Sequence, residues 1–204
     1  MSIFLYYNLN KERGFLIVQV LKDEIRKKIL DTSEHIFFQS GFKNTTTRRI
    51  ADEVGISVSN LYLYYENKEA ILYGVADAFY TYIINSINAL LDHDDKDKTM
   101  NDNICQFVQK MILLDQKKFV IITDKSEGTK YEGCKQQIIT ILFNHMKEQI
   151  NKDFIQDDLI LHILAKNFIE GIIEIAKNYK NQYWLENNIH ILFQYHIKGI
   201  EQYM

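Results

Sequence analysis

The sequence predicts an all-α fold, with an N-terminal three-helix helix-turn-helix domain followed by a C-terminal helical domain. Three observations support this class. The 204 residues include no proline and only eight glycines, so little in the chain interrupts a helix. Apolar residues recur at helical spacing through most of the chain. An apolar content of 47% is also sufficient for a substantial buried core.

Capping residues delimit the helices expected in the N-terminal part. These helices cover about Leu21–Gln39, the stretch from the Thr45–Thr47 run to about Val54, about Val58–Tyr64 with Ser57 as cap, and the stretch from Asn67 to about Leu91. Side-chain oxygens of threonine, serine and asparagine accept hydrogen bonds from the free N–H groups at helix starts. Gly41 and Gly55 follow the first two helices, where glycine adopts a left-handed backbone at little cost.

The C-terminal part is expected to be helical after a charged loop at His93–Thr99. Its helices cover about Asn101–Asp115, Lys118–Asp124, Thr129–Ile150, Asp157–Tyr179 and Trp184–Gln202. The last two have apolar faces wider than one core requires, which indicates packing on a second subunit over about residues 157–202. In a two-fold homodimer these helices would form a four-helix bundle.

Residues 1–20 form a leader before the first expected helix. Polar and charged residues interrupt it, and it lacks the basic start and cleavage site of a signal peptide. We expect it to be disordered, or an extension upstream of a true start at Val18 or Val20. No apolar run reaches the roughly 18 residues that span a bilayer, so no membrane association is expected. Two widely spaced cysteines, Cys105 and Cys134, indicate a reducing cytoplasm.

Residues 41–72 carry the most informative pattern, two short helices joined by a tight glycine turn, which is a helix-turn-helix. Such short helices persist only when packed on a scaffold, which leaves one outer face free to enter a DNA major groove. On that face, Asn60 suits paired hydrogen bonds to adenine and Val58 suits a thymine methyl. The net charge of −3 excludes binding by bulk charge, so DNA contacts must come from a local cluster.

The expected DNA-contacting residues come from both short helices and their flanks. They are Lys43, Thr45, Thr46, Thr47, Arg48, Ser57, Val58, Ser59, Asn60, Tyr62, Leu63, Tyr64 and Lys68. Lys68 is the most specific of them, because a lysine at a helix start opposes the helix dipole unless an anion lies nearby. Free N–H groups and an ammonium together predict a phosphate site. The alternative is that Lys68 is an ordinary solvated lysine.

This stretch resembles the TetR family of bacterial regulators over about residues 25–72. The resemblance rests on an ungapped series: Ile29-Leu30, Phe37, Gly41-Phe42, the threonine run, Ile50-Ala51, Gly55-Ile56-Ser57, Leu61-Tyr62, Tyr64-Tyr65 and Lys68-Glu69. It implies DNA binding by residues 21–67, with dimerisation and binding of a small-molecule inducer by residues 68–204. It also implies a repressor that reads an inverted-repeat operator. Ser59 stands where the family commonly has glycine, which is expected to alter base preference.

A ligand pocket is expected among the helices at 101–179. Its candidate lining residues are Phe107, Met111, Phe119, Tyr131, Phe143, Met146 and Phe168, and the alternative for each is an ordinary core position. Asp158 and His162 share a helix face, but a metal site needs a further ligand, so no metal or cofactor is expected. The sequence has no nucleophile elbow, phosphate-binding glycine loop or zinc-ligand pattern, so we do not expect an enzyme. The second hypothesis is a helical adaptor that binds only protein.

Overall fold

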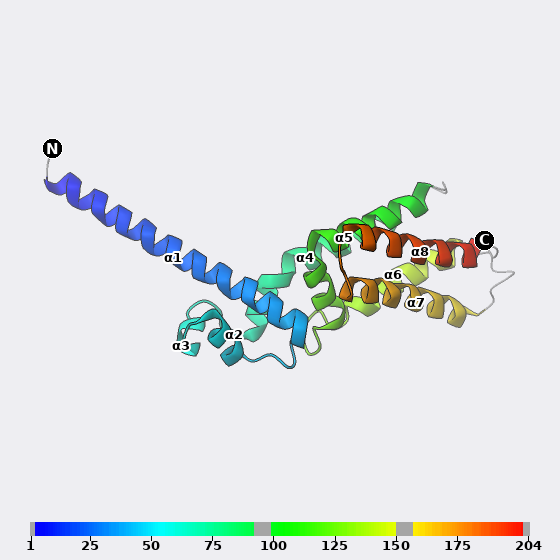
Figure 1. Cartoon of the computed structure of the whole chain (residues 1–204), viewed down its shortest axis with the longest axis horizontal. Helices are drawn as coiled ribbons and strands as arrows, with labels where there is room; N and C mark the ends of the chain where they lie inside the picture. Colours follow the sequence, from blue (N-terminus) through cyan, green and yellow to red (C-terminus); the bar gives the residue numbers. More distant parts are fainter. Residues whose placement is uncertain (1–2, 92–98, 150–156, 202–204) are drawn as a thin grey trace. The chain divides into compact units, whose positions relative to one another are not determined.

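The computed structural model of this chain describes residues 3–91, 99–149 and 157–201. The regular elements within these ranges are helices, which confirms the predicted all-α class (Figure 1). They are α1 (Ile3–Ser40), α2 (Thr47–Val54), α3 (Val58–Leu61), α4 (Lys68–Leu91), α5 (Thr99–Asp124), α6 (Cys134–Gln149), α7 (Asp158–Lys177) and α8 (Gln182–Glu201). The charged loop expected at His93–Thr99 lies outside the described residues, apart from Thr99.

Two predicted helix starts differ from the structure. The first helix begins at Ile3 and not near Leu21, because residues 3–20 contain no proline and nothing local ends the helix. The leader is therefore helical in the structure, while the alternative translation start stays a prediction. The α6 helix begins at Cys134 and not near Thr129, because tight turns occupy residues 129–133. In these turns backbone N–H groups donate to carbonyls only three residues back, as Glu132 does to Thr129.

The α5 helix is interrupted at Asp115, as the separate helices over 101–115 and 118–124 predicted. Asp115 has φ −161° and ψ 84°, outside the helical range. Its carboxylate accepts a hydrogen bond from the backbone N–H of Lys118 at 3.0 Å and pairs with the Lys118 ammonium at 2.5 Å. Asp115 thus caps the second half of α5, and the two halves are separate helical segments.

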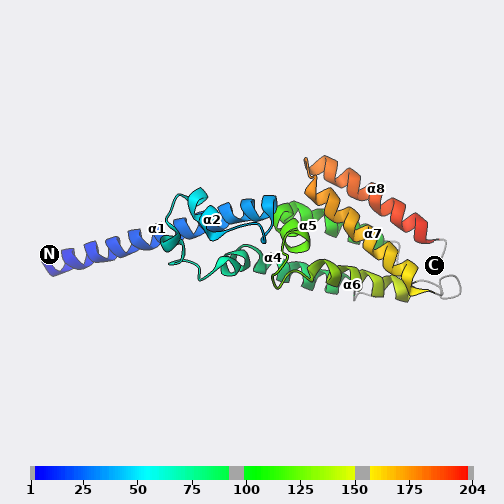
Figure 2. The ribbon, with the colours of Figure 1, turned by 90° about the horizontal axis from the view of Figure 1, so that it is seen from below.

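The chain divides into two compact units, one of residues 1–36 with 45–75 and the other of residues 37–44 with 76–204. Both α1 and α4 contribute residues to each unit. The functional boundary expected at residue 67 stays a prediction. In the second unit, α7 packs against α5, α6 and α8 (Figure 2). Gly171 on α7 allows a close approach by α8, because a Cβ there would lie 3.1 Å from the Leu192 side chain.

Both cysteines are buried in this second unit and are not joined in a disulfide. Burial raises the pKa of the Cys134 thiol to about 12, so it is a thiol and not a reactive thiolate at neutral pH. None of the described helices combines the length and hydropathy needed to cross a bilayer.

His196 on α8 predicts acid sensitivity. Its ring stacks on Phe168 with centroids 4.2 Å apart, and its Nε2 is buried without a hydrogen-bond partner among the described residues. Burial lowers the pKa of His196 to about 4. Between pH 6.5 and 4 the unfolded chain therefore binds this proton more readily, so His196 should reduce stability as the pH falls through that window.

The His196→Phe variant should keep the stacking and lose this contribution. Urea unfolding at pH 7 and pH 5 would then show a smaller loss of stability in the variant than in the original chain. Equal losses in the two proteins would contradict the assignment.

Candidate nucleic-acid interface

Local capping sets both ends of α2 and the start of α3 as predicted. Thr46 is extended and its Oγ1 accepts a hydrogen bond from the Arg49 N–H at 3.2 Å. Ser57 is also extended, and its Oγ accepts a hydrogen bond from the Asn60 N–H at 3.1 Å. Gly55 has φ 81° and its N–H donates to the Ala51 carbonyl at 2.9 Å, so the left-handed backbone predicted for it is confirmed.

Two further predicted caps are confirmed at the ends of α1 and α4. Gly41 has φ 76°, and its N–H donates to the carbonyl of Phe37 at 2.8 Å. At the start of α4, the Asn67 Oδ1 accepts a hydrogen bond from the Ala70 N–H at 2.7 Å. The predicted third helix is shorter than expected, because residues 62–64 turn with bonds such as Leu63 N–H to the Asn60 carbonyl.

Burial of one face orients the two short helices. Ile50 and Ala51 of α2 and Leu61 of α3 have no exposed surface, and Val54 has almost none. A helix of four residues such as α3 has no stability alone, so these contacts hold it in place. The opposite faces of α2 and α3 are consequently turned to solvent.

Two lysines from the flanking helices bind backbone carbonyls at the two ends of α2. The Lys28 ammonium on α1 donates to the Val54 carbonyl at 2.8 Å, where the negative end of the helix dipole favours a cation. The Lys68 ammonium at the start of α4 donates to the Thr45 carbonyl at 2.6 Å. Burial lowers the pKa of Lys68. Lys68 therefore helps to position α2, whether or not it also binds a phosphate.

Most of the residues predicted to contact DNA have accessible side chains. Those that are exposed are Lys43, Thr46, Arg48, Ser57, Ser59, Tyr62 and Leu63, and those that are half-buried are Thr47, Val58, Asn60, Tyr64 and Lys68. Thr45 differs, because only 1% of it is exposed. A phosphate contact through the Thr45 hydroxyl does not fit this burial, and its carbonyl is the acceptor for Lys68.

Two of the predicted contacts have specific surroundings. Leu63 is 82% exposed and Tyr62 is 50% exposed, so apolar surface lies beside the polar face of α3 and suits thymine methyl groups. Lys43 pairs with Glu127 at 2.6 Å, and this hydrogen bond raises the pKa of Lys43. A phosphate bound by Lys43 would have to compete with Glu127.

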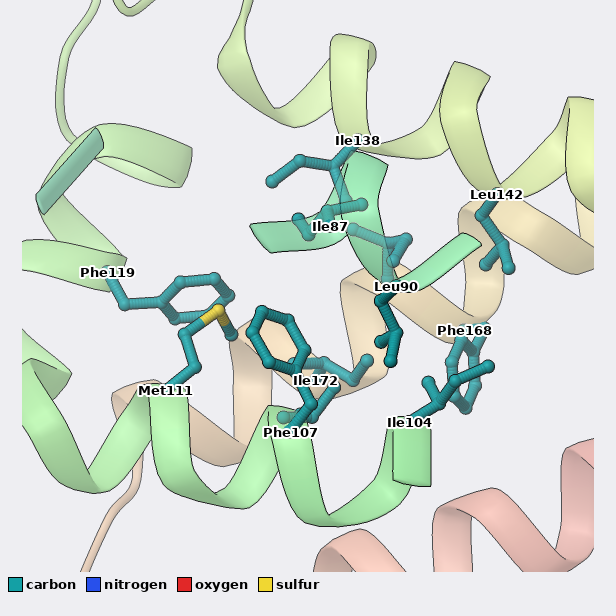
Figure 3. Close-up of a pocket in the computed structure, with 12 residues that line it drawn as sticks. Ile87, Leu90, Ile104, Phe107, Met111, Phe119, Ile138, Leu142, Phe168 and Ile172 are labelled. Carbon is teal, nitrogen blue, oxygen red and sulfur yellow. The ribbon is translucent and has the colours of Figure 1, made fainter. Parts of the chain in front are cut away.

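A second candidate site is a cavity in the second unit, enclosed by α4, α5, α6 and α7 (Figure 3). Its volume is about 70 Å³. Four residues from the predicted pocket line it: Phe107, Met111, Phe119 and Phe168. Sequence reasoning missed the aliphatic lining residues Ile87, Leu90, Ile104, Val108, Ile138, Leu142, Ile169 and Ile172, because their spacing is that of any helix core.

The three other predicted pocket residues do not line this cavity. Tyr131 is buried, and its hydroxyl donates to Asp77 at 2.5 Å. Phe143 packs edge-on against His162, and Met146 is buried elsewhere on α6. Asp158 pairs with Lys147, and no three potential metal ligands gather in the part of the chain that the structure describes.

A capped and buried pair of short helices with one accessible polar face defines this chain as a helix-turn-helix DNA-binding protein. Residues 29–74 match the family described as bacterial regulatory proteins, tetR family. This match identifies residues 29–74 as a DNA-binding domain of the TetR type and confirms the resemblance predicted over residues 25–72; the proteins of this family are transcriptional regulators and not enzymes.

Relatives and solved structures agree with this assignment. The chain is 28% identical over 187 residues to the biofilm operon icaADBC HTH-type negative transcriptional regulator IcaR of Staphylococcus epidermidis, covering 81% of this chain and 98% of IcaR. It is 29% identical over 87 residues to the tetracycline repressor protein class C of Escherichia coli, covering 43% and 39% of the two chains. A TetR-family regulator structure from Bordetella parapertussis matches 88% of this chain and 97% of its own, with 16% identity and a TM-score of 0.67, which shows a shared fold.

Proposed function

We propose that this regulator is a ligand-responsive repressor that binds an inverted-repeat operator as a homodimer. The observation that carries the DNA-binding part is the accessible outer face of α3, supported by buried residues on its inner face. The relatives named as a negative regulator and as a repressor favour repression. A dimer would present two recognition helices about one turn of DNA apart, roughly 34–36 Å, or somewhat more.

On this proposal the contacts divide into two kinds. The residues that contact base edges are Val58, Ser59, Asn60, Tyr62 and Leu63. The residues that bind the DNA backbone are Lys43, Thr46, Thr47, Arg48, Ser57, Tyr64 and Lys68. Arg48 is also of a residue type that binds the edge of guanine. Selection of bound fragments from random duplex DNA tests the proposal. It should yield an inverted repeat, bound in a salt-dependent manner. Binding without sequence preference would contradict it.

Replacing Asn60 by alanine should relax specificity at one base pair of each half-site. A bidentate contact to adenine provides about 1–3 kcal/mol of discrimination, so preference for adenine there should fall about tenfold or more. Competition binding with single-substituted operators measures the change. Asn144→Ala, at an exposed position on α6 outside the proposed dimer interface, is the matched control and should leave preference unchanged. If Asn60→Ala keeps full discrimination at every position, Asn60 is not a base contact.

The homodimer proposal is supported by apolar side chains exposed along α7 and α8. Leu159, Ile160 and Ile163 on α7 are 61%, 44% and 39% exposed, and Ile191 and Tyr195 on α8 are 58% and 79% exposed. Extended apolar surface of this kind on a single chain marks an interaction site. The predicted dimerisation segment at about 157–202 includes all five.

Ile191→Glu should therefore produce monomers and weaken operator binding, because two half-sites can no longer be bound together. The matched control is Leu114→Glu, since Leu114 is 60% exposed on α5, outside the proposed interface. Sedimentation velocity measures the assembly state, and fluorescence anisotropy measures operator affinity, which should fall by about a hundredfold or more in Ile191→Glu alone. A dimeric Ile191→Glu protein would contradict the interface.

A further inference from the structure

We propose that the cavity of the second unit binds a small, uncharged molecule of hydrocarbon character, and that this molecule is the effector. The inference rests on the proposed ligand response and names the chemical class of the ligand. Both halves of α5 line one side of the cavity, and α4, α6 and α7 line the other sides (Figure 3). Phe107, Met111 and Phe119 come from α5 itself.

The lining selects against charge. All of the lining side chains are aliphatic, aromatic or methionine. A carboxylate or ammonium transferred into such surroundings loses hydration and finds no hydrogen-bond partner on the lining side chains, which costs free energy. A hydrocarbon gains free energy by the same transfer. The lining therefore favours an uncharged molecule over an ion of similar size.

The titratable group that contacts the lining from behind does not change this selectivity. His196 stacks on Phe168, which lines the cavity. Burial lowers the pKa of His196 to about 4, so its ring is neutral at physiological pH and provides no cation for an acidic ligand. Gln109 is a polar residue next to the lining residue Val108. Its side-chain amide donates hydrogen bonds to the Glu186 carbonyl and to the Cys105 sulfur, so these contacts are with the protein and not with the cavity.

The size of the cavity sets an upper limit on the ligand unless the walls move. A dry apolar cavity of about 150 Å³ is known to hold benzene, and this cavity has about 70 Å³. An aromatic ligand must therefore displace wall atoms. Met111 is flexible enough to adapt. Because α5 is interrupted at Asp115, between Met111 and Phe119, its two halves can also shift separately.

Such a shift has a path towards the DNA-binding residues. The second half of α5 ends at Asp124, and the next residue, Lys125, accepts a hydrogen bond through its carbonyl from the Phe42 N–H at 2.8 Å. Lys43 pairs with Glu127 in the same turn. Only Asn44 separates Phe42 and Lys43 from the threonine run that caps α2. A ligand that moves Phe119 and its helix would thus pull on the segment that leads into the helix-turn-helix.

The test compares toluene with its charged isosteres benzoate and benzylammonium, using the full chain. Calorimetry gives the melting temperature, and fluorescence anisotropy gives affinity for a selected operator. Toluene at ten times its Kd should raise the melting temperature by about 3 °C or more, and should weaken operator binding about fivefold or more. Neither charged compound should do so.

Two variants locate the binding site. Ile172→Phe fills the cavity, and Leu142→Phe fills it from a half-buried lining position if the first variant does not fold. Each should abolish the toluene response. Leu114→Phe, at an exposed position on α5 outside the lining, is the control and should respond like the original chain.

Three results would overturn the inference: no response to toluene, an equal response to benzoate or benzylammonium, or a full toluene response in the folded cavity-filling variant. Failure of the proposed function would give a different result from failure of this inference. In that case the ligand-free protein would not bind any selected duplex, while the melting temperature would still rise with toluene.

Discussion

Replacing Lys68 by methionine is expected to weaken operator binding about tenfold and to make the slope of log K against log salt concentration shallower by about one. Lys68 lies at the start of α4, where the helix dipole favours an anion, and its ammonium also binds the Thr45 carbonyl at 2.6 Å. Loss of one phosphate contact lowers the slope of log K against log salt by about 0.9. Anisotropy titrations at several salt concentrations measure both quantities.

Lys28→Met is the matched comparison for this experiment. Lys28 binds the Val54 carbonyl at the other end of α2 and is not a predicted phosphate ligand. Its loss should weaken operator binding through the position of α2, with an unchanged salt slope. If Lys68→Met also leaves the slope unchanged, Lys68 only positions the Thr45 carbonyl, and the phosphate assignment is wrong.

Replacing Leu61 by alanine is expected to remove most operator binding by destabilising the helix-turn-helix. Leu61 is the fully buried residue of the four-residue α3 and has no exposed surface. Truncation of a buried leucine to alanine costs about 2–5 kcal/mol, depending on how far the site can collapse. Because α3 lacks stability of its own, much of this loss should appear as local unfolding around α3.

Hydrogen exchange of amides in residues 45–75 and chemical denaturation measure this effect. Leu63→Ala is the matched control, since Leu63 is 82% exposed and its truncation should change stability by less than about 0.5 kcal/mol. A Leu61→Ala protein with native exchange rates in α2 and α3 would contradict the proposed role of this residue in the packing.

The features of residues 41–67 that the sequence predicted correctly are those determined by neighbouring residues. Thr46, Ser57 and Asn67 accept hydrogen bonds from N–H groups three residues later, and Gly41 and Gly55 have left-handed backbones. Each depends on residue type and on a short segment of chain, so it can be recognised without tertiary structure. The break in α5 at Asp115 is of the same kind.

Features that depend on tertiary contacts were missed. The bond from Lys28 to the Val54 carbonyl joins residues 26 positions apart, and any exposed lysine on α1 looks equivalent in the sequence. Burial of Thr45 has the same origin, since three adjacent threonines differ only in the direction they face. For the cavity, the sequence-based prediction named mostly aromatic residues. It omitted Ile87 and Leu90 on α4, because their pattern in the sequence is the same as that of ordinary core positions.

The attachment of Phe42 to Lys125 also matters for exchanging parts between regulators. Residues 37–44 belong to the second unit, although they comprise the last turn of α1 and the residues that lead from it towards α2. Phe37 and Phe42 are buried there with ring centroids 5.9 Å apart. A fragment cut after Val75 would carry both rings without their surroundings and should aggregate. A chimera is better built by grafting residues 1–36 and 45–75 together, with residues 37–44 kept from the recipient.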